Sequence, residues 1–271
     1  MIPKIIHYCW FGHNPKSELI LRCIESWKKF CPDYEIKEWN EDNYDFSRCQ
    51  YAADAYKEKK WGFVPDFIRL KLIYEFGGIY LDTDVELIKN LDPLLNKPAL
   101  VAFENNNSVN TGSVIMAEPG NTIIKAMYEF YDTISFYHKD GSLNLTASPY
   151  YNTQVLSHFG LKPNNTEQIL TDGKSELFVY PAEYFCPKNF VTQELNITAN
   201  TYSIHWYDAS WFDDVMKTVW DYRRKVSQKI KNRKVIDFLV HLYSLKQRFK
   251  FYGPKETIKY YMKLLKRRIQ Q

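Results

Sequence analysis

Residues 65–85 read PDFIRLKLIYEFGGIYLDTDV, and this segment indicates the architecture more clearly than any other part of the chain. Pro65 suits the first position of a helix, and Gly77 suits the residue just beyond the end of one. The segment therefore predicts a helix that runs to Phe76. A short apolar strand over residues 79–81 follows it.

The same segment carries two pairs of charged residues. Asp66 and Arg69 lie three apart and share a helix face, while Asp82 and Asp84 lie two apart at the end of the strand. Taken singly, each pair has an ordinary interpretation, as a surface ion pair or a solvated turn. Together they favour a divalent metal ion held between carboxylates and a diphosphate leaving group. Arg69 could clamp a phosphate, and Asp66 could accept hydrogen bonds from sugar hydroxyls.

Strands alternate with helices on both sides of this segment. We expect strands at residues 2–8, 34–39, 99–103, 113–117, 177–180 and 202–206, and helices after Ser17, at 50–60, at 121–135 and from residue 211 onward. Residues 138–153 are polar and predict a loop. This alternation predicts an α/β fold with a mostly parallel central sheet. A change of composition near residue 216 predicts a body at 1–215 and a basic helical extension at 216–271.

Several motifs give the chain a resemblance to a known family. They are PKIIHYCW at residues 3–10, Ser26-Trp27 with Pro32, and Asp66-x-x-Arg69 leading into GGIYLDTDV at residues 77–85. These resemble glycosyltransferase family 32, the group with a DXD sugar-binding region that is often associated with capsular polysaccharide synthesis. The core is also similar to the glucosyltransferase domains of large clostridial toxins. The clear resemblance covers residues 2–117.

The resemblance implies a GT-A-like catalytic domain over residues 1–215, a nucleotide-sugar donor, Mn²⁺ or Mg²⁺, and retention of anomeric configuration. It implies that Asp84 contacts the metal ion directly, and that Asp82 binds the ribose and donor sugar or the metal. Asp66 and Arg69 would hold sugar hydroxyls and phosphate.

The resemblance also implies roles around the nucleotide. Trp10 would lie against the base, and Tyr80 would support the nucleotide. The segment Asn110-Thr111-Gly112 resembles the lining of the donor-sugar pocket, although a simple turn is the alternative. Relatives commonly have Thr-Gly-Pro in the middle region, where this chain has TASP at 146–149, which leaves an acceptor-pocket role there open.

A later segment, SIHWYDASW at residues 203–211, resembles the histidine- and tryptophan-containing segment of the family. His205 would complete the metal shell, since imidazole suits Mn²⁺. A lone histidine is more often structural, and that alternative stays open. Ser210 and Trp211 would touch the diphosphate as part of a closing loop.

Charge is divided unevenly along the chain. Residues 217–271 hold 17 Lys and Arg against three acidic residues, whereas the whole chain carries only +4. Ile258, Tyr261, Met262, Leu265 and Ile269 form one stripe of a basic amphipathic helix. This favours an anionic membrane that presents a lipid-linked glycan acceptor, and packing on the body is the alternative. No nucleic-acid recognition module is recognisable, so we expect no nucleic-acid partner.

The N-terminus shows no signal-peptide pattern, and no apolar run is long enough to span a bilayer. The five cysteines contain no C-x-x-C pair, which argues against a zinc site or a disulfide framework. We therefore expect a cytoplasmic protein, with peripheral attachment to the inner face of the cell membrane as an option.

Two other classes of protein fit parts of the sequence. A haloacid-dehalogenase-type phosphatase also places D-x-D after an apolar strand, and Asp213-Asp214 could serve as its later acidic pair. That motif normally ends the first strand of its domain, which is not the case here. A non-catalytic carbohydrate-binding protein is the other alternative. For the transferase, no carboxylate can be nominated as a nucleophile, so front-face attack is favoured, with a uridine diphosphate sugar as the first donor and guanosine diphosphate mannose as the second.

Overall fold

The computed structural model describes residues 1–45, 48–105, 107–208 and 214–269, without the side chains of 233 and 263–269. The chain divides into two compact units. The first comprises residues 1–188 and 195–208, and the second comprises residues 189–194 and 209–271. No helix among the described residues is both long enough and apolar enough to cross a bilayer.

The first unit is built on a seven-stranded sheet in the order β2-β1-β3-β6-β5-β8-β7. Its strands are β1 (Ile5–Cys9), β2 (Glu35–Trp39), β3 (Gly78–Tyr80), β5 (Ala99–Ala102), β6 (Ile115–Ala117), β7 (Gln168–Thr171) and β8 (Glu176–Tyr180). The strands β1, β2, β3, β5 and β8 point the same way, while β6 and β7 run against them. The predicted α/β class and mostly parallel sheet are confirmed.

A second, two-stranded sheet lies outside the first. It pairs β4 (Val85–Leu87) with β9 (Ser203–His205) in antiparallel register, with Val85 opposite His205. β4 follows β3 after a four-residue turn that contains both acidic residues of the D-x-D motif. This pairing therefore places β9, near the end of the first unit, beside the residues that follow β3.

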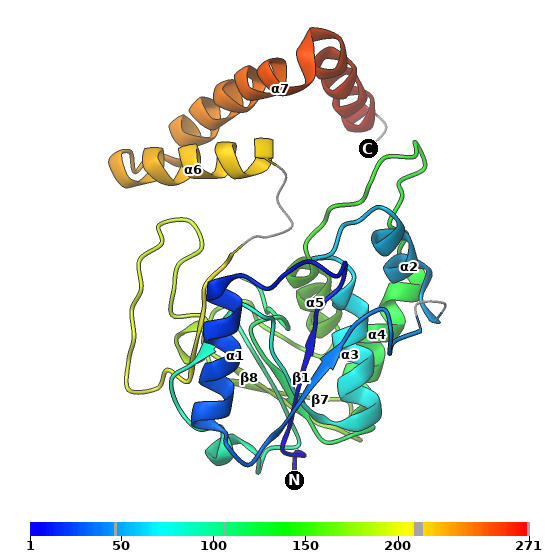
Figure 1. Cartoon of the computed structure of the whole chain (residues 1–271), viewed down its shortest axis with the longest axis vertical. Coiled ribbons are helices and arrows are strands. Elements are labelled where there is room, and N and C mark those ends of the chain that lie inside the picture. The colour runs from blue at the N-terminus through cyan, green and yellow to red at the C-terminus, as the bar shows by residue number, and fades with distance from the viewer. Residues whose placement is uncertain (46–47, 106, 209–213, 270–271) are drawn as a thin grey trace. The chain divides into compact units, whose positions relative to one another are not determined.

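Helices cover both faces of the large sheet (Figure 1). They are α1 (Glu18–Phe30), α2 (Gln50–Lys57), α3 (Pro65–Phe76), α4 (Thr122–Glu129) and α5 (Ser148–Ser157). Alternation along β1 separates the two faces, because Ile6 and Tyr8 join the core cluster that contains Ile24 and Trp27 of α1. His7, on the opposite face, lies against Phe76 of α3. α3 and α4 run side by side on that face (Figure 1).

The predicted loop over residues 138–153 is wrong at its C-terminal end, since α5 begins at Ser148. Pro149 lies in the first turn of this helix, where proline is well tolerated. Val155 and Leu156 then anchor it in the core. The polar residues that suggested a loop form the beginning of the helix.

The connection between α3 and β3 requires two glycines. Gly77 and Gly78 have φ values of 66° and 93°, a region that other residues rarely adopt. A Cβ atom at Gly78 would lie 2.7 Å from the Ile5 carbonyl oxygen and 3.1 Å from Nε2 of His7. The chain thus reverses from helix to strand in direct contact with β1.

The side chain of His7 stabilises this reversal. Its side chain is buried, its Nε2 lies 3.0 Å from the Gly77 carbonyl oxygen, and its Nδ1 accepts a hydrogen bond of 3.1 Å from Trp39 Nε1. Burial, with Lys37 adding to it, outweighs the bond to Gly77 and lowers the pKa of His7 to about 4. The imidazole is therefore neutral at pH 7.

The second unit consists of α6 (Asp214–Lys229), α7 (Arg233–Ile269) and residues 189–194. The rings of Tyr222 and Tyr243 stack at 3.9 Å between centroids, and Arg223 pairs with Asp237 at 2.6 Å. These contacts hold α6 against α7. α7 bends at Gly253, whose φ of 78° interrupts the helix before Pro254.

Acidification is expected to destabilise the first unit through His7. The pKa of His7 in the folded state lies below its ordinary value of 6.5. The contribution of neutral His7 to the unfolding free energy is therefore fully present above pH 6.5 and is lost as the pH falls toward 4. Between pH 7 and pH 5 the wild-type protein should lose about 2 kcal/mol more unfolding free energy than His7→Gln, measured by urea denaturation. His138→Gln, at an exposed histidine, is the matched control. Equal pH dependence of wild type and His7→Gln would contradict the assignment.

Candidate active site

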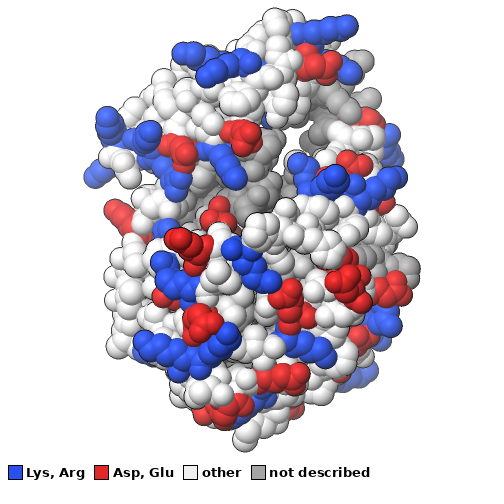
Figure 2. All heavy atoms as spheres, in the orientation of Figure 1, with Lys and Arg blue, Asp and Glu red and all other residues white. Residues whose placement is uncertain are grey.

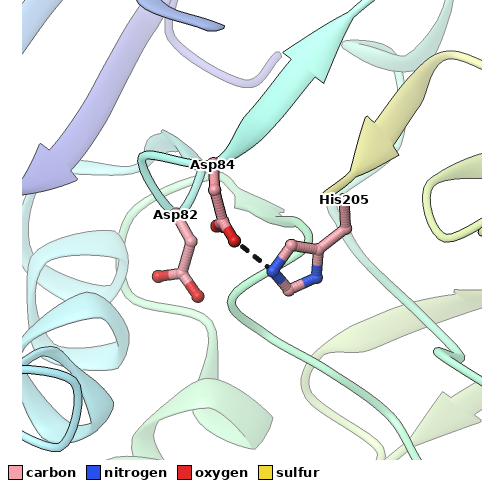
Figure 3. Close-up of side chains that lie close together, drawn as sticks. All are labelled: Asp82, Asp84 and His205. Atoms are coloured by element: carbon pink, nitrogen blue, oxygen red, sulfur yellow. Dashed lines mark ion pairs between the residues drawn. The ribbon is translucent and has the colours of Figure 1, made fainter. Parts of the chain in front are cut away.

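Asp82, Asp84 and His205 form a cluster at the carboxyl end of β3 (Figure 3). One ligand atom of each residue lies within 4.8 Å of the others. Asp84 and His205 point toward one another, with 3.3 Å between Oδ1 and Nε2. The β4–β9 pairing produces this contact, because His205 lies opposite Val85, the residue after Asp84.

The electrostatics of the cluster keep Asp84 charged. Burial acts to raise the pKa of Asp84, but His205 and the backbone N–H of Asp208, at 2.8 Å, lower it below its usual value. Burial opposes charging of His205, yet the Asp84 carboxylate raises the pKa of the imidazole well above its ordinary value. Two carboxylates and an imidazole are a donor set that suits Mn²⁺, and a divalent cation would take the place of the His205 proton.

Arg69 links this cluster to α3. Its buried guanidinium lies 2.9 Å from Asp66 Oδ1 and 3.4 Å from Asp82 Oδ1, and its Nε donates to the Pro65 carbonyl oxygen. Tyr80 lies under the guanidinium at 5.2 Å and donates a 3.1 Å hydrogen bond to Asp82. Arg69 is therefore the shared cationic partner of Asp66 and Asp82, and Tyr80 is an additional hydrogen-bond donor to Asp82.

Asp66 is the more deeply buried of those two carboxylates. Burial raises the pKa of Asp66 to about 7, with Arg69 working against the shift and Asp82 adding to it. The Ser148 hydroxyl also hydrogen-bonds to Asp66. Ser148 belongs to the 146–149 segment that departs from the family pattern, so this segment lies beside Asp66.

The Asn110–Gly112 segment packs directly against the cluster. Asp82 N–H donates to the Gly112 carbonyl oxygen at 2.8 Å, and Gly112 N–H donates to Asn110 Oδ1 at 2.8 Å. A Cβ atom at Gly112 would overlap the Asp82 carboxylate and lie 2.5 Å from Arg69 Nη1. Only glycine leaves room here for the Asp82–Arg69 contact.

Sequence reasoning did not identify Glu104, which orients Asn110. Its carboxylate accepts a 3.0 Å hydrogen bond from Asn110 Nδ2 and a 2.9 Å hydrogen bond from Ser108. Burial raises the pKa of Glu104, and these donors oppose the shift. Glu104 is a positioning residue, since its oxygen atoms are engaged by the loop that it orients.

Sequence reasoning also missed two tyrosines beside Asp66. Tyr51 and Tyr131 are each 1% exposed, and their rings meet at 5.1 Å between centroids. Neither hydroxyl has a hydrogen-bond partner among the residues that the structure describes. Burial, followed by the charge of Asp66, raises the pKa of each phenol, so both stay protonated. A buried hydroxyl without a partner costs free energy, which makes this pair a candidate for ligand contact.

The other residues that the sequence predicts for the site are Trp10, Ser210 and Trp211. Trp10 follows β1, and the carboxyl ends of the parallel strands β1 and β3 share one edge of the sheet. Its indole N–H donates to the Asn14 carbonyl oxygen at 2.7 Å. Ser210 and Trp211 lie outside the described residues, as does Asp213.

Parts of the chain are similar to a known sequence family and to several known proteins. Residues 17–101 match the family described as "Glycosyltransferase sugar-binding region containing DXD motif". Inositol phosphoceramide mannosyltransferase 3 of Schizosaccharomyces pombe is 35% identical over 108 residues, which are 37% of this chain and 29% of the relative. Inositol phosphoceramide mannosyltransferase 1 of the same organism is 22% identical over 185 residues, covering 62% of this chain and 56% of the relative.

The chain thus spans less than two thirds of the length of each of these curated relatives. Among solved structures, PaToxG Glycosyltransferase aligns with a TM-score of 0.45 and 22% identity, over 58% of this chain and 69% of that chain. The region that matches the family, residues 17–101, contains Asp66, Arg69, Asp82 and Asp84, whereas His205 lies outside it.

Arg69→Met is expected to lower the unfolding free energy by about 3 kcal/mol at pH 8, because two carboxylates lose their shared cation. Adding Asp66→Asn should restore part of this loss, since one of the two charges is removed. Urea denaturation of the wild type, both single variants and the double variant measures the coupling. Additive effects of the two substitutions would show that the Arg69–Asp66 contact does not contribute.

Proposed function

We propose that this protein is a metal-dependent, retaining glycosyltransferase of the GT-A type. It would move a sugar from a nucleotide-sugar to a glycan or lipid-linked glycan acceptor. The observation that carries the proposal is the convergence of Asp82, Asp84 and His205 beside the buried Asp66–Arg69 pair. The match of residues 17–101 to a DXD sugar-binding region supports the same reaction class.

Asp84, His205 and Asp82 would hold Mn²⁺ or Mg²⁺, with Asp82 also oriented by Arg69 and Tyr80. The bound metal would supply Lewis-acid neutralisation of the diphosphate as the anomeric bond breaks. The Asp208 backbone N–H would keep Asp84 in position. Trp10 would lie against the base, and Ser210 and Trp211 would contact the diphosphate.

The donor sugar would lie against Asp66, Arg69, Tyr51 and Tyr131. In this position the two tyrosine hydroxyls would gain the hydrogen-bond partners that they lack in the free protein. Asn110, held by Glu104, would line the same pocket.

Retention would proceed by front-face attack. The departing phosphate oxygen would then help to deprotonate the acceptor hydroxyl, and the chain would contribute positioning and electrostatic stabilisation. Glu104 does not take the part of a nucleophile in this scheme, because its oxygens are engaged by Asn110 and Ser108.

The donor class is proposed from two sources. The family resemblance favours a uridine diphosphate sugar and an acceptor in a bacterial surface or capsular polysaccharide. The names of the fungal relatives add mannose transfer to an inositol phosphoceramide, for which guanosine diphosphate mannose is a suitable donor. Because such acceptors are made at membranes, the cytoplasmic face of a membrane is the proposed location.

Release of the nucleoside diphosphate from a panel of uridine and guanosine diphosphate sugars should identify the donor. With Mn²⁺ present, one donor should be turned over, and chelation should abolish the reaction. Asp84→Asn should reduce turnover by roughly two orders of magnitude or more and also reduce Mn²⁺ binding in equilibrium dialysis. Asp132→Asn, at an exposed acid, should behave like wild type.

Turnover that persists in Asp84→Asn or after chelation would contradict the metal assignment. Hydrolysis of a simple phosphate ester, without turnover of any nucleotide-sugar, would instead favour the phosphatase. Nucleotide-sugar binding without release of the nucleotide in the presence of acceptors would favour the carbohydrate-binding alternative.

Tyr131→Phe is expected to lower kcat/KM for the donor about tenfold without a loss of stability. The hydroxyl has no hydrogen-bond partner in the free protein, so its removal costs folding nothing but removes a sugar contact. Tyr34→Phe is the matched control, because Tyr34 donates a 2.8 Å hydrogen bond to Asp92 near the opposite ends of the strands. It should lose stability and keep its activity. Unchanged kinetics of Tyr131→Phe would exclude the proposed contact.

A further inference from the structure

α7 has two apolar faces, and the described contacts of one of them hold the helix against α6. Ile236, Val240 and Gln247 are buried, and Tyr243, which shares their side of the helix, stacks on Tyr222 of α6. This face accounts for the packing of the two helices.

The other apolar face is a stripe of alternating three- and four-residue spacing. It consists of Val235, Phe238, Leu242, Leu245, Phe249 and Tyr252. This spacing places all six side chains along one line of a helix. Phe238 is 61% exposed, Leu242 and Tyr252 are 47% exposed, and Leu245 is half-buried. We call these six residues the α7 stripe.

Basic residues border the α7 stripe. Lys234 and Arg248 lie along one edge of the stripe, at the same heptad position as His241. Lys246 and Lys250 lie along the other edge. Asp237 is the acidic residue of this part of α7, and it is paired with Arg223. Figure 2 shows many more basic than acidic side chains over α6 and α7.

The basic residues along both edges of the α7 stripe indicate what kind of partner it binds. In a coiled coil with a second copy, the flanking positions of the two helices would face each other, and here both would be basic. Like charges at these positions oppose self-association. An anionic lipid surface matches both features, because it accepts apolar and aromatic side chains and attracts the basic residues around them.

We propose that the α7 stripe lies on an anionic membrane surface. Beyond the bend at Gly253, Ile258 and Met262 are also exposed apolar side chains, at 57% and 53% exposure. The sequence pattern predicts membrane contact at residues 257–269, and the exposed apolar residues of the α7 stripe begin more than 20 positions earlier. The proposal does not depend on the transferase reaction, since none of these residues belongs to the candidate active site.

The experiment is flotation of the full chain with vesicles of phosphatidylcholine alone and of phosphatidylcholine mixed with phosphatidylglycerol. Wild type should float with the anionic vesicles and not with the neutral ones. The double variant Phe238→Ser/Leu242→Ser should bind at least tenfold less. Ile169→Ser, at a residue of β7 that is 57% exposed, is the matched control and should bind like wild type.

Lys246→Gln/Lys250→Gln should weaken binding and reduce its sensitivity to salt. Since all four substituted residues of α7 are exposed or border exposed positions, circular dichroism should report an unchanged helix content. Equal flotation of wild type and Phe238→Ser/Leu242→Ser would overturn the proposal. So would a wild type that does not float, or a dimer in sedimentation that this double variant abolishes. Donor turnover in solution, measured on the same preparations, separates this result from the test of the transferase.

Discussion

The buried guanidinium of Arg69 is the constraint on which the site depends. It lies between Asp66 on α3 and Asp82 after β3, so the helix and the strand must approach closely enough for one cation to reach both. The reversal at Gly77-Gly78 makes that approach possible, and the missing side chain of Gly112 leaves space for it. Burying a cation is costly unless its partners are in place, which ties the correct placement of Asp82 to the packing of the whole α3 face.

The second half of the site is assembled by backbone pairing. Asp84 reaches His205 because β4 and β9 are hydrogen-bonded in a small sheet of their own. Trp27 reinforces this sheet by donating from Nε1 to the Val85 carbonyl oxygen at 2.7 Å, which connects α1 to the turn. Two different forces thus set the two carboxylates: ion pairing holds Asp82, and strand register holds Asp84.

Local features of the sequence predicted the centre of the fold well. The helix from Pro65 to Phe76 has the predicted bounds, and the strand that follows is shifted by one residue. Proline, glycine and a run of apolar residues act over short distances, so they can be interpreted without tertiary information. The start of α5 at Ser148 could not be predicted in this way, since its buried face includes the polar residues Ser148 and Asn152, whereas the aromatic Tyr150 is 61% exposed. The unpartnered hydroxyls of Tyr51 and Tyr131 were also out of reach, because they result from packing between α2 and the segment after α4.

The pairing of β4 with β9 also has a consequence for biosynthesis. About 120 residues separate Asp84 from His205, and a chain leaves the ribosome N-terminal end first. The large sheet can be complete once residue 180 has emerged, yet β4 still lacks its partner strand at that stage. A nascent chain of that length holds Asp82 and Asp84 without the imidazole. The three-residue cluster therefore closes only after nearly all of the first unit has been synthesised, which leaves a truncated translation product with an incomplete cluster.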